Sequence, residues 1–417
     1  MKRLIVTGKK TLEGTIKISG AKNSAVALIP ASLLAEDEVI IENVPNISDI
    51  NSLNDILKYL GVNLVRENDR IKINLSNLQN KKVPEEIGTK LRASYYFMAS
   101  LLAKYKKVEM YFPGGCSIGA RPIDQTLKVF KKLGATIIEE DNLFKISAEK
   151  LTGADIVLDM PSVGATINAI IACSKAEGIS TIRNSAKEPE IVDVANFLNK
   201  MGANIAGAGT DTIIISGVDK LYGCTHEVIP DRIEAGTFIL AGVLVGKNLK
   251  IDNVNINHVK SLLDVLEKMN ADIKIYDHYV IANKSVTKAI DVVTEGYPGF
   301  PTDLQQPLTS LLICSDGISH IKETIYENRF QNVKYLNDMG ANIKLLNNKE
   351  IEINGNSNLV AKEVVATDLR AGACMLLSAL NAEGTSIINE VEHVLRGYEK
   401  ITEKLSAVGA KIELDEI

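Results

Sequence analysis

The stretch NKMGANIA, residues 199–206, is one of six similar stretches in this chain of 417 residues. Each has a hydrophobic residue, then Gly or Asn, then Ala or Val, and then a run in which polar and apolar residues alternate. The six central residues are Gly61, Gly134, Gly202, Asn270, Gly340 and Gly409. Their spacings of 73, 68, 68, 70 and 69 residues indicate six repeats that fill the chain.

Within each repeat we expect the same elements in the same order. An apolar helix rich in Ala and Ser, as at 373–382, precedes a short strand, as at 386–389. An amphipathic helix follows, with apolar residues at the 3.6-residue period, as between Ile50 and Leu60. The central glycine then suits the end of that helix, because Gly enters the left-handed conformation freely. Two further strands close the repeat.

The first 20 residues have the strand–turn–strand pattern that links one repeat to the next, although no repeat precedes them. We expect them to complete the sixth repeat, whose own tail is short. Repeats one to three would then form a domain over residues 21–229, and residues 1–20 plus 230–417 would form a second domain. The two chain crossings, near Gly20 and Pro230, would make a natural hinge.

Composition excludes several classes of protein. A net charge of −5 argues against a broad nucleic-acid-binding face. The longest apolar run, 238–246, is too short to cross a bilayer, and the basic start lacks the apolar core of a signal peptide, so we expect a cytoplasmic protein. Five widely spaced cysteines without CxxC, and five histidines without HExxH, favour neither a disulfide framework nor a metal site. Cys173, Cys314 and Cys374 lie in apolar stretches and are most simply core residues.

A repeat protein can be a solenoid without chemistry, but the starts of the six apolar helices are polar. The starts lie at residues 19–25, 89–95, 161–167, 230–236, 301–307 and 367–373. We expect Ser, Thr or Asp to cap each helix. Capping does not explain Lys22, Arg92 and Arg370, because a cation opposes the dipole at a helix N-terminus. These cations make more sense around a bound anion.

Seven motifs give the chain a close resemblance to a known family. They are SGAKN (19–23), PGGCSIGARP (113–122), SVGAT (162–166), PTD (301–303), ENRF (327–330), TDLRAG (367–372) and RGYE (396–399). In their order and spacing the chain resembles, from end to end, the enolpyruvyl transferases of the EPSP synthase superfamily. Among these it is similar to the members that act on UDP-N-acetylglucosamine.

The resemblance implies an α/β fold of two inside-out α/β barrel domains, each made of three repeats with buried helices surrounded by sheets. It implies transfer of the enolpyruvyl group of phosphoenolpyruvate to the 3'-hydroxyl of UDP-N-acetylglucosamine, with release of phosphate. The reaction is an addition–elimination through a tetrahedral intermediate and is the first committed step of peptidoglycan synthesis. The two small-molecule substrates are the expected partners, and no cofactor, metal, nucleic acid or membrane is implied.

The resemblance also assigns roles to individual residues. Asp303 would take the proton of the sugar hydroxyl, and Cys116 would protonate the methylene carbon, form a covalent phospholactoyl adduct and react with fosfomycin. The other two catalytic residues would be Lys22 and Arg396. The residues implied for phosphoenolpyruvate are Lys22, Asn23, Arg121, Arg329, Arg370 and Arg396. The residues implied for UDP-N-acetylglucosamine are Asn23, Arg92, Arg121, Pro122, Ile123, Asp124, Gln125, Ser162, Val163, Gly164, Asp303 and Ile325.

Two departures and two alternatives remain open. Some relatives carry a basic residue where this chain has Met160 and a histidine where it has Thr126, so contacts to the diphosphate differ in detail. One alternative is the shikimate-pathway enolpyruvyl transferase, which shares the fold but lacks the cysteine loop. The other is a catalytically silent paralogue that binds a UDP-sugar and regulates a partner.

Overall fold

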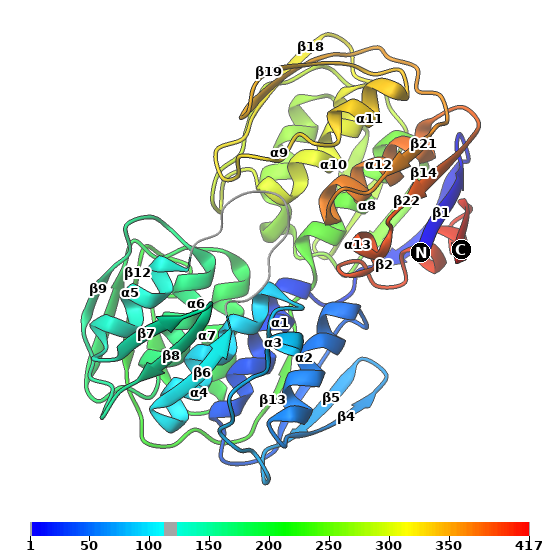
Figure 1. Ribbon diagram of the computed structural model, residues 1–417. Helices are drawn as coiled ribbons and strands as arrows, with labels where there is room; N and C mark the ends of the chain where they lie inside the picture. The colour runs from blue at the N-terminus through cyan, green and yellow to red at the C-terminus, as the bar shows by residue number, and fades with distance from the viewer. Residues whose placement is uncertain (1, 112–122, 417) are drawn as a thin grey trace. The chain divides into compact units, whose positions relative to one another are not determined.

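The computed structural model describes residues 2–111 and 123–416, which divide into two compact units. Unit I comprises the described residues between 20 and 229, and unit II comprises residues 2–19 and 230–416. Both units are α/β, with helices and mixed sheets (Figure 1). Each unit holds three of the six repeats.

The elements of unit I follow the repeat three times. The first repeat has α1 (Lys22–Ala31), η1 (Ser32–Leu34), β3 (Val39–Glu42), α2 (Ser48–Tyr59), β4 (Asn63–Glu67) and β5 (Arg70–Asn74). The second has α3 (Glu85–Gly88), η2 (Arg92–Tyr95), α4 (Tyr96–Tyr105), β6 (Lys107–Tyr111), α5 (Asp124–Lys132), β7 (Thr136–Glu140) and β8 (Leu143–Ser147). The third has β9 (Asp155–Val157), α6 (Val163–Cys173), β10 (Ile179–Arg183), α7 (Pro189–Lys200), β11 (Asn204–Ala206), β12 (Thr212–Ser216) and β13 (Thr225–Glu227).

The elements of unit II repeat the plan. The fourth repeat has α8 (Arg232–Val245), β14 (Gly246–Asp252), η3 (Ile256–Val259), α9 (Lys260–Lys268), β15 (Ile273–Ile275) and β16 (Tyr279–Ala282). The fifth has β17 (Val292–Val293), α10 (Thr302–Leu312), β18 (Ile318–Lys322), α11 (Val333–Asp338), β19 (Asn342–Asn347) and β20 (Glu350–Asn354). The sixth has β21 (Glu363–Val365), α12 (Leu369–Asn381), β22 (Thr385–Asn389), α13 (Glu392–Leu395), α14 (Ile401–Ala407) and β23 (Lys411–Glu416).

The repeats share one sheet topology. In the fifth repeat the order is β17-β18-β20-β19, where β17 and β18 are parallel and the other pairs are antiparallel. The same arrangement gives β13-β3-β5-β4, β9-β10-β12-β11 and β15-β16-β14-β2. In the second repeat, β6-β8-β7 is three-stranded, and a parallel bridge from Val83 to Met110 stands in place of the fourth strand.

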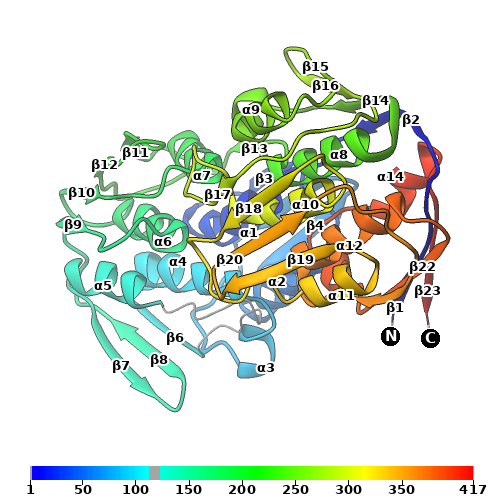
Figure 2. The ribbon, with the colours of Figure 1, turned by 90° about the horizontal axis from the view of Figure 1, so that it is seen from above.

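The two N-terminal strands belong to the sheets of unit II. β2 (Leu12–Lys17) lies parallel to β14, while β1 (Lys2–Thr7) lies antiparallel between β22 and β23. β1 therefore takes the position in the sixth repeat that β20 takes in the fifth. In both ribbon views the blue β1 lies against the red end of the chain, and the two termini are side by side (Figures 1 and 2).

The central residue of each repeat was predicted to end an amphipathic helix in the left-handed conformation, and the structure confirms this. All six central residues have positive φ, from +59° at Asn270 to +104° at Gly202 and Gly409. Asn270 can replace glycine because Asn tolerates the left-handed region better than most residues. The apolar positions of the first amphipathic helix, such as Ile50, Leu53 and Ile56, are fully buried, as the 3.6-residue period predicts.

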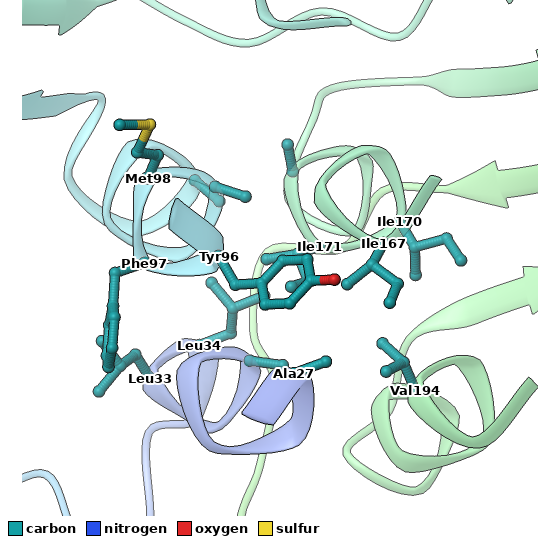
Figure 3. Close-up of a cluster of buried hydrophobic side chains, with 14 of the residues drawn as sticks. Ala27, Leu33, Leu34, Tyr96, Phe97, Met98, Ile167, Ile170, Ile171 and Val194 are labelled. Carbon is teal, nitrogen blue, oxygen red and sulfur yellow. The ribbon is translucent and has the colours of Figure 1, made fainter. Parts of the chain in front are cut away.

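The apolar helices form the core of each unit. In unit I, α4 contacts both α1 and α6, and in unit II, α8, α10 and α12 contact one another. Figure 3 shows Tyr96 of α4 lying over Ala27 of α1 and pointing toward Ile167 of α6. Burial among these side chains raises the pKa of the Tyr96 hydroxyl well above its ordinary value. Among the described residues, no helix is long and apolar enough to span a membrane.

Candidate functional site

The starts of the apolar helices were predicted to be capped by Ser, Thr or Asp, and this holds for three of them. Ser162 accepts a hydrogen bond from Ala165 N, Asp231 caps α8, and Asp368 caps α12. The prediction is wrong for α1, η2 and α10, whose N-caps are Ala21, Leu91 and Pro301 without a side-chain bond. The reason is competition, because the nearby hydroxyl groups bond elsewhere: the Thr302 hydroxyl donates to Glu323 and the Thr89 hydroxyl to Glu85 O.

A cluster of largely buried charges in unit II joins the start of α10 to the start of α12. Asp303 receives Arg329 Nη2 on one oxygen at 2.7 Å and Arg370 Nη2 on the other at 2.8 Å. The side chain of Arg329 is 2% exposed and that of Arg370 is 6% exposed, whereas Asp303 is 25% exposed. Two guanidinium groups thus converge on a single carboxylate, with their donors directed toward one point.

Asp368 and Tyr398 fix the directions of the two arginines. Asp368 accepts hydrogen bonds from Arg370 N and Ala371 N and lies 3.7 Å from Arg329 Nη1. Tyr398, which is buried, accepts a hydrogen bond of 3.2 Å from Arg370 Nη1. Burial opposes the charge of Arg370, but Asp303, Tyr398 and Asp231 together raise its pKa above the ordinary arginine value.

A buried glutamate holds the loop that carries Arg329. Glu323 is fully buried at the end of β18, where one oxygen accepts from the Thr302 hydroxyl at 2.9 Å and the other from Ile325 N at 2.8 Å. The side chain of Gln306 in α10 donates to Arg329 O at 2.8 Å. The loop is thereby tied to the helix that bears Asp303. Ile325 itself is 42% exposed, beside this cluster in the chain.

Arg396 belongs to a loop that packs against the start of α12. A Cβ atom on Gly397 would lie 2.7 Å from Leu369 Cδ2 and 2.9 Å from its Cδ1, so the leucine side chain would have to move if residue 397 were larger. The next residue, Tyr398, donates or accepts a 2.9 Å bond with the Thr237 hydroxyl of α8. The loop that carries Arg396 therefore lies against the helix start that carries Arg370. The hydrogen bond from Arg370 to Tyr398 links the two segments.

In unit I, the start of α1 is anchored at two points. Lys22 Nζ lies 2.9 Å from Asp49 Oδ2 in α2, with only 16% of the lysine side chain exposed. The Ser24 hydroxyl donates to Asp193 of α7, and His226 Nε2 lies 2.8 Å from the other oxygen of Asp193. Asn23, between the two anchored residues, is partly exposed. The cation predicted to meet an anion is thus held in place by a carboxylate.

Arg92, Ser162 and Gly164 lie at two neighbouring helix starts. Arg92 lies 5.9 Å from the ring centre of Tyr95. A Cβ atom on Gly164 would lie 1.5 Å from the Tyr95 hydroxyl, so the absence of a side chain at 164 lets the starts of η2 and α6 approach. Ser162 caps α6, and Val163 is its first residue.

The start of α5 is joined to the segment before α6 through Asp159. Gln125 donates to Asp159 Oδ2 at 2.8 Å and accepts from Asp159 N at 2.9 Å. Lys128 Nζ lies 2.5 Å from Asp159 Oδ1. Bonds from Gln125 and Lys128 lower the pKa of Asp159. A hollow of about 550 Å³ adjoins α5, lined by Asp124, Leu127, Lys128, Lys131 and Lys132.

Met160 and Thr126, the two positions at which this chain departs from some relatives, differ in their exposure. Met160 is 62% exposed beside this hydrogen-bonded segment, while Thr126 is 2% exposed. Ile123 is buried and precedes α5 as its N-cap. Three predicted site residues, Cys116, Arg121 and Pro122, lie outside the described residues.

Cys173, Cys314 and Cys374 were predicted to be core residues, and the structure buries them fully or in part. Cys173 and Cys374 are fully buried, and burial raises the pKa of their thiols to about 12 and about 11. Cys314 is partly buried and Asn381 Nδ2 donates to its sulfur. Among residues 2–111 and 123–416, no three His, Cys, Asp or Glu side chains are arranged to hold a metal ion.

Sequence reasoning missed the residues that orient the arginines. Tyr398 lies in the RGYE motif but was given no role, and Glu323 and Gln306 lie in no motif. A buried acid is visible in sequence only as a charged residue after a strand that mixes polar and apolar residues, as Glu323 is after ISHIK. That signal does not specify what the acid contacts.

Comparison with known proteins extends over the whole chain. A family model described as EPSP synthase (3-phosphoshikimate 1-carboxyvinyltransferase) matches residues 6–405. The chain is 48% identical to UDP-N-acetylglucosamine 1-carboxyvinyltransferase 2 of Listeria monocytogenes serovar 1/2a, over 98% of this chain and 97% of that protein. It is 47% identical to the protein of the same name from Bacillus subtilis strain 168, over 99% of this chain and 96% of that protein.

Solved structures of enolpyruvyl transferases match the fold of this chain. The enolpyruvyl transferase NikO from Streptomyces tendae matches with a TM-score of 0.90 and 25% identity, over 99% of both chains. An EPSP synthase from Acinetobacter baumannii matches with a TM-score of 0.77 and 20% identity over the full length of both chains, which supports the fold alone. Because the family model and relatives at nearly half identity cover almost all of the sequence, the chain belongs to the EPSP synthase family of enolpyruvyl transferases.

Proposed function

We propose that this protein transfers the enolpyruvyl group of phosphoenolpyruvate to the 3'-hydroxyl of UDP-N-acetylglucosamine and releases phosphate, the first committed step of peptidoglycan synthesis. The names of the full-length relatives support this choice of acceptor. The observation that carries it is the convergence of Arg329 and Arg370 on the carboxylate of Asp303. Phosphoenolpyruvate brings a carboxylate and a phosphate, and buried paired guanidinium groups suit both.

The cluster suggests how binding prepares the base. In the structure the Asp303 carboxylate accepts from both Arg329 and Arg370. When the carboxylate of phosphoenolpyruvate takes over part of these contacts, an oxygen of Asp303 is released toward the sugar hydroxyl. Substrate binding would then create the base that the next step requires.

The remaining roles follow the resemblance and are proposals. Lys22, Arg121 and Arg396 would bind the phosphate of phosphoenolpyruvate, and Asn23 would hydrogen-bond both substrates. The UDP moiety would be held by Arg92, by residues 121–125 and by residues 162–164, with Ile325 against the nucleotide sugar. Lys22 is already held by Asp49, which favours a fixed cation over a mobile one.

The chemistry balances with one base and one acid. Asp303 takes the proton of the 3'-hydroxyl as its oxygen attacks C2 of phosphoenolpyruvate, and Cys116 donates a proton to C3. In the tetrahedral intermediate the arginines stabilise the negative charge. Cys116 then takes a proton back from C3, and phosphate leaves C2 with the proton held by Asp303, which restores the double bond in the product and the starting state of both residues. No metal or organic cofactor is needed for these steps.

We also propose that each unit is an inside-out α/β barrel, with three buried helices surrounded by three sheets. The chain passes between the units at Ser19–Gly20 and Ile229–Pro230, and these passages are proposed as the hinge. Small-angle scattering should report a smaller radius of gyration on addition of UDP-N-acetylglucosamine. An unchanged radius would reject closure.

The deciding experiment measures phosphate release from phosphoenolpyruvate with each acceptor. Turnover with UDP-N-acetylglucosamine and none with shikimate 3-phosphate is the expected result. Turnover with shikimate 3-phosphate alone would reject the proposal in favour of the shikimate-pathway reaction. Binding of UDP-N-acetylglucosamine by calorimetry without turnover would identify a silent paralogue.

A further inference from the structure

Two motif positions have no role in the proposed chemistry, namely Ser19 of SGAKN and Glu399 of RGYE. The structure brings them together in unit II, where the Ser19 hydroxyl donates to Glu399 Oε2 at 2.5 Å. Their positions differ by 380 residues, so only the fold unites them. Ser19 is also the last residue of unit II before the chain passes into unit I.

The ion pair between Lys404 and the buried Glu234 holds Ser19 in this contact. Lys404 Nζ of α14 donates to the Ser19 hydroxyl at 2.7 Å and to Glu234 Oε1 of α8 at 2.5 Å. The other oxygen of Glu234 accepts from Ser19 N at 2.8 Å, and Ser19 O accepts from Asp231 N at 2.9 Å. Glu234 is 3% exposed. Every polar group of Ser19 is thus engaged by this network.

The network ends at the arginine cluster. Glu234 and Thr237 are three residues apart on α8 and lie on one face of the helix. Thr237 bonds the hydroxyl of Tyr398, which accepts from Arg370, while the network of Glu234 bonds Glu399, the next residue of the same loop. One helix face therefore fixes the loop of residues 396–399 at two adjacent positions.

We propose that Ser19, Glu234 and Lys404 are positioning residues that set the Arg396–Glu399 loop and so control the affinity for phosphoenolpyruvate. This inference rests on the proposed function. Ser19 and Lys404 orient the Glu399 carboxylate, and Glu234 holds Lys404 in place. None of the three is a catalytic residue, because each acts through the loop.

The network is sensitive to protonation. Burial raises the pKa of Glu234 to about 7, against the opposing effect of Lys404 and with a further increase from Asp231. The charged groups around Glu234 are Lys404 on α14, Asp231 at the start of its own helix, and Glu399 beyond the Ser19 hydroxyl. As the pH falls below 7, Glu234 takes up a proton and the ion pair with Lys404 is lost, which loosens the loop even though the fold as a whole is more stable with Glu234 neutral.

The test compares Ser19→Ala and Glu234→Gln with Glu403→Gln, an exposed glutamate on α14 that serves as a matched control. We expect both variants to raise the KM for phosphoenolpyruvate about tenfold, the equivalent of about 1.4 kcal/mol. Their kcat and their KM for UDP-N-acetylglucosamine should stay within about threefold of wild type, roughly 0.6 kcal/mol by the same relation. The double variant Glu234→Gln/Lys404→Met, which leaves no unpaired buried charge, should bind better than Lys404→Met alone.

The pH profile separates positioning from a general loss of structure. The KM of wild type should rise below pH 7 more steeply than that of Glu234→Gln. The phosphate of the substrate titrates near pH 6 in both proteins, so the difference between the two profiles belongs to Glu234. Identical profiles would reject the protonation step.

Hydrogen exchange makes the test independent of activity. Peptides covering residues 392–405 should exchange faster in Ser19→Ala and Glu234→Gln than in wild type and Glu403→Gln. Exchange and KM equal to those of Glu403→Gln would overturn the inference. If wild type shows no turnover, the proposed function fails, but the exchange rates still decide whether the network holds the loop.

Discussion

Replacement of Asp303 by alanine tests the electrostatic core of the proposed site. The change removes one carboxylate and leaves two guanidinium groups, 2% and 6% exposed, without their partner. A hydrogen bond to a charged group contributes about 1.5–3 kcal/mol, so the two bonds together contribute about 3–6 kcal/mol. Removal of one partner of a buried ion pair typically costs about 3–5 kcal/mol, in agreement with that sum.

This cost should appear in thermal unfolding. For a unit of this size, 1 kcal/mol shifts the melting temperature by about 2–4 °C, so Asp303→Ala should lower the melting temperature of unit II by roughly 10 °C. The control is Asp264→Ala, which breaks an exposed pair with Lys260. An exposed pair at this spacing contributes only about 0.3–0.5 kcal/mol, so the control should shift by about 2 °C or less.

Inorganic phosphate should partly repair the variant. An anion that binds the freed arginines at 100 times its Kd stabilises the folded state by about 2.7 kcal/mol. Phosphate should therefore raise the melting temperature of Asp303→Ala more than that of wild type, whose arginines already hold a carboxylate. An Asp303→Ala shift equal to that of Asp264→Ala, or equal phosphate effects in both proteins, would refute the argument. Turnover should fall about 10²–10⁴-fold if Asp303 is the base.

Three further perturbations test other parts of the structure. Cys116→Ser should slow turnover strongly and prevent alkylation by fosfomycin, and mass spectrometry that finds normal labelling would reject the assigned role. Gly164→Ala should weaken UDP-N-acetylglucosamine binding in calorimetry, because the new Cβ would lie 1.5 Å from the Tyr95 hydroxyl; Tyr95→Phe should recover it only partly, since Cζ remains 2.7 Å away. The pKa of Glu234 is raised from 4.5 to about 7, so its contribution to stability is complete below pH 4.5 and is lost as the pH rises through 7. Denaturant titrations should show this loss, up to about 3 kcal/mol, in wild type and not in Glu234→Gln.

The sequence predicts the fold well because its signals are local and repeated. Six central residues with a positive φ, and six apolar helices in the expected order, follow from patterns that span fewer than 20 residues each. The positions of Lys22, Arg92 and Arg370 at helix starts were also predicted, because a helix start has a recognisable sequence.

Several contacts within the site could not be predicted because they are made across repeats. Asp303 and Arg370 are 67 residues apart, and no local pattern shows that they share a bond. The same limit explains one of the three wrong caps. Ser19 was expected to cap α1, but its hydroxyl is engaged by Glu399 and Lys404 from the other end of the chain.

The position of β1 has a consequence for how the chain folds as it is synthesised. Its six residues leave the ribosome before the rest of unit II, but their partners β22 and β23 are made about 400 residues later. The segment up to residue 229 can fold during synthesis, while the sixth sheet stays incomplete until β23 emerges. Because Lys2 pairs with Glu416, a short linker could join residues 416 and 2, and a circular permutant cut at Gly20 would place β1 and β2 directly after β23, so that unit II would be made as one continuous segment.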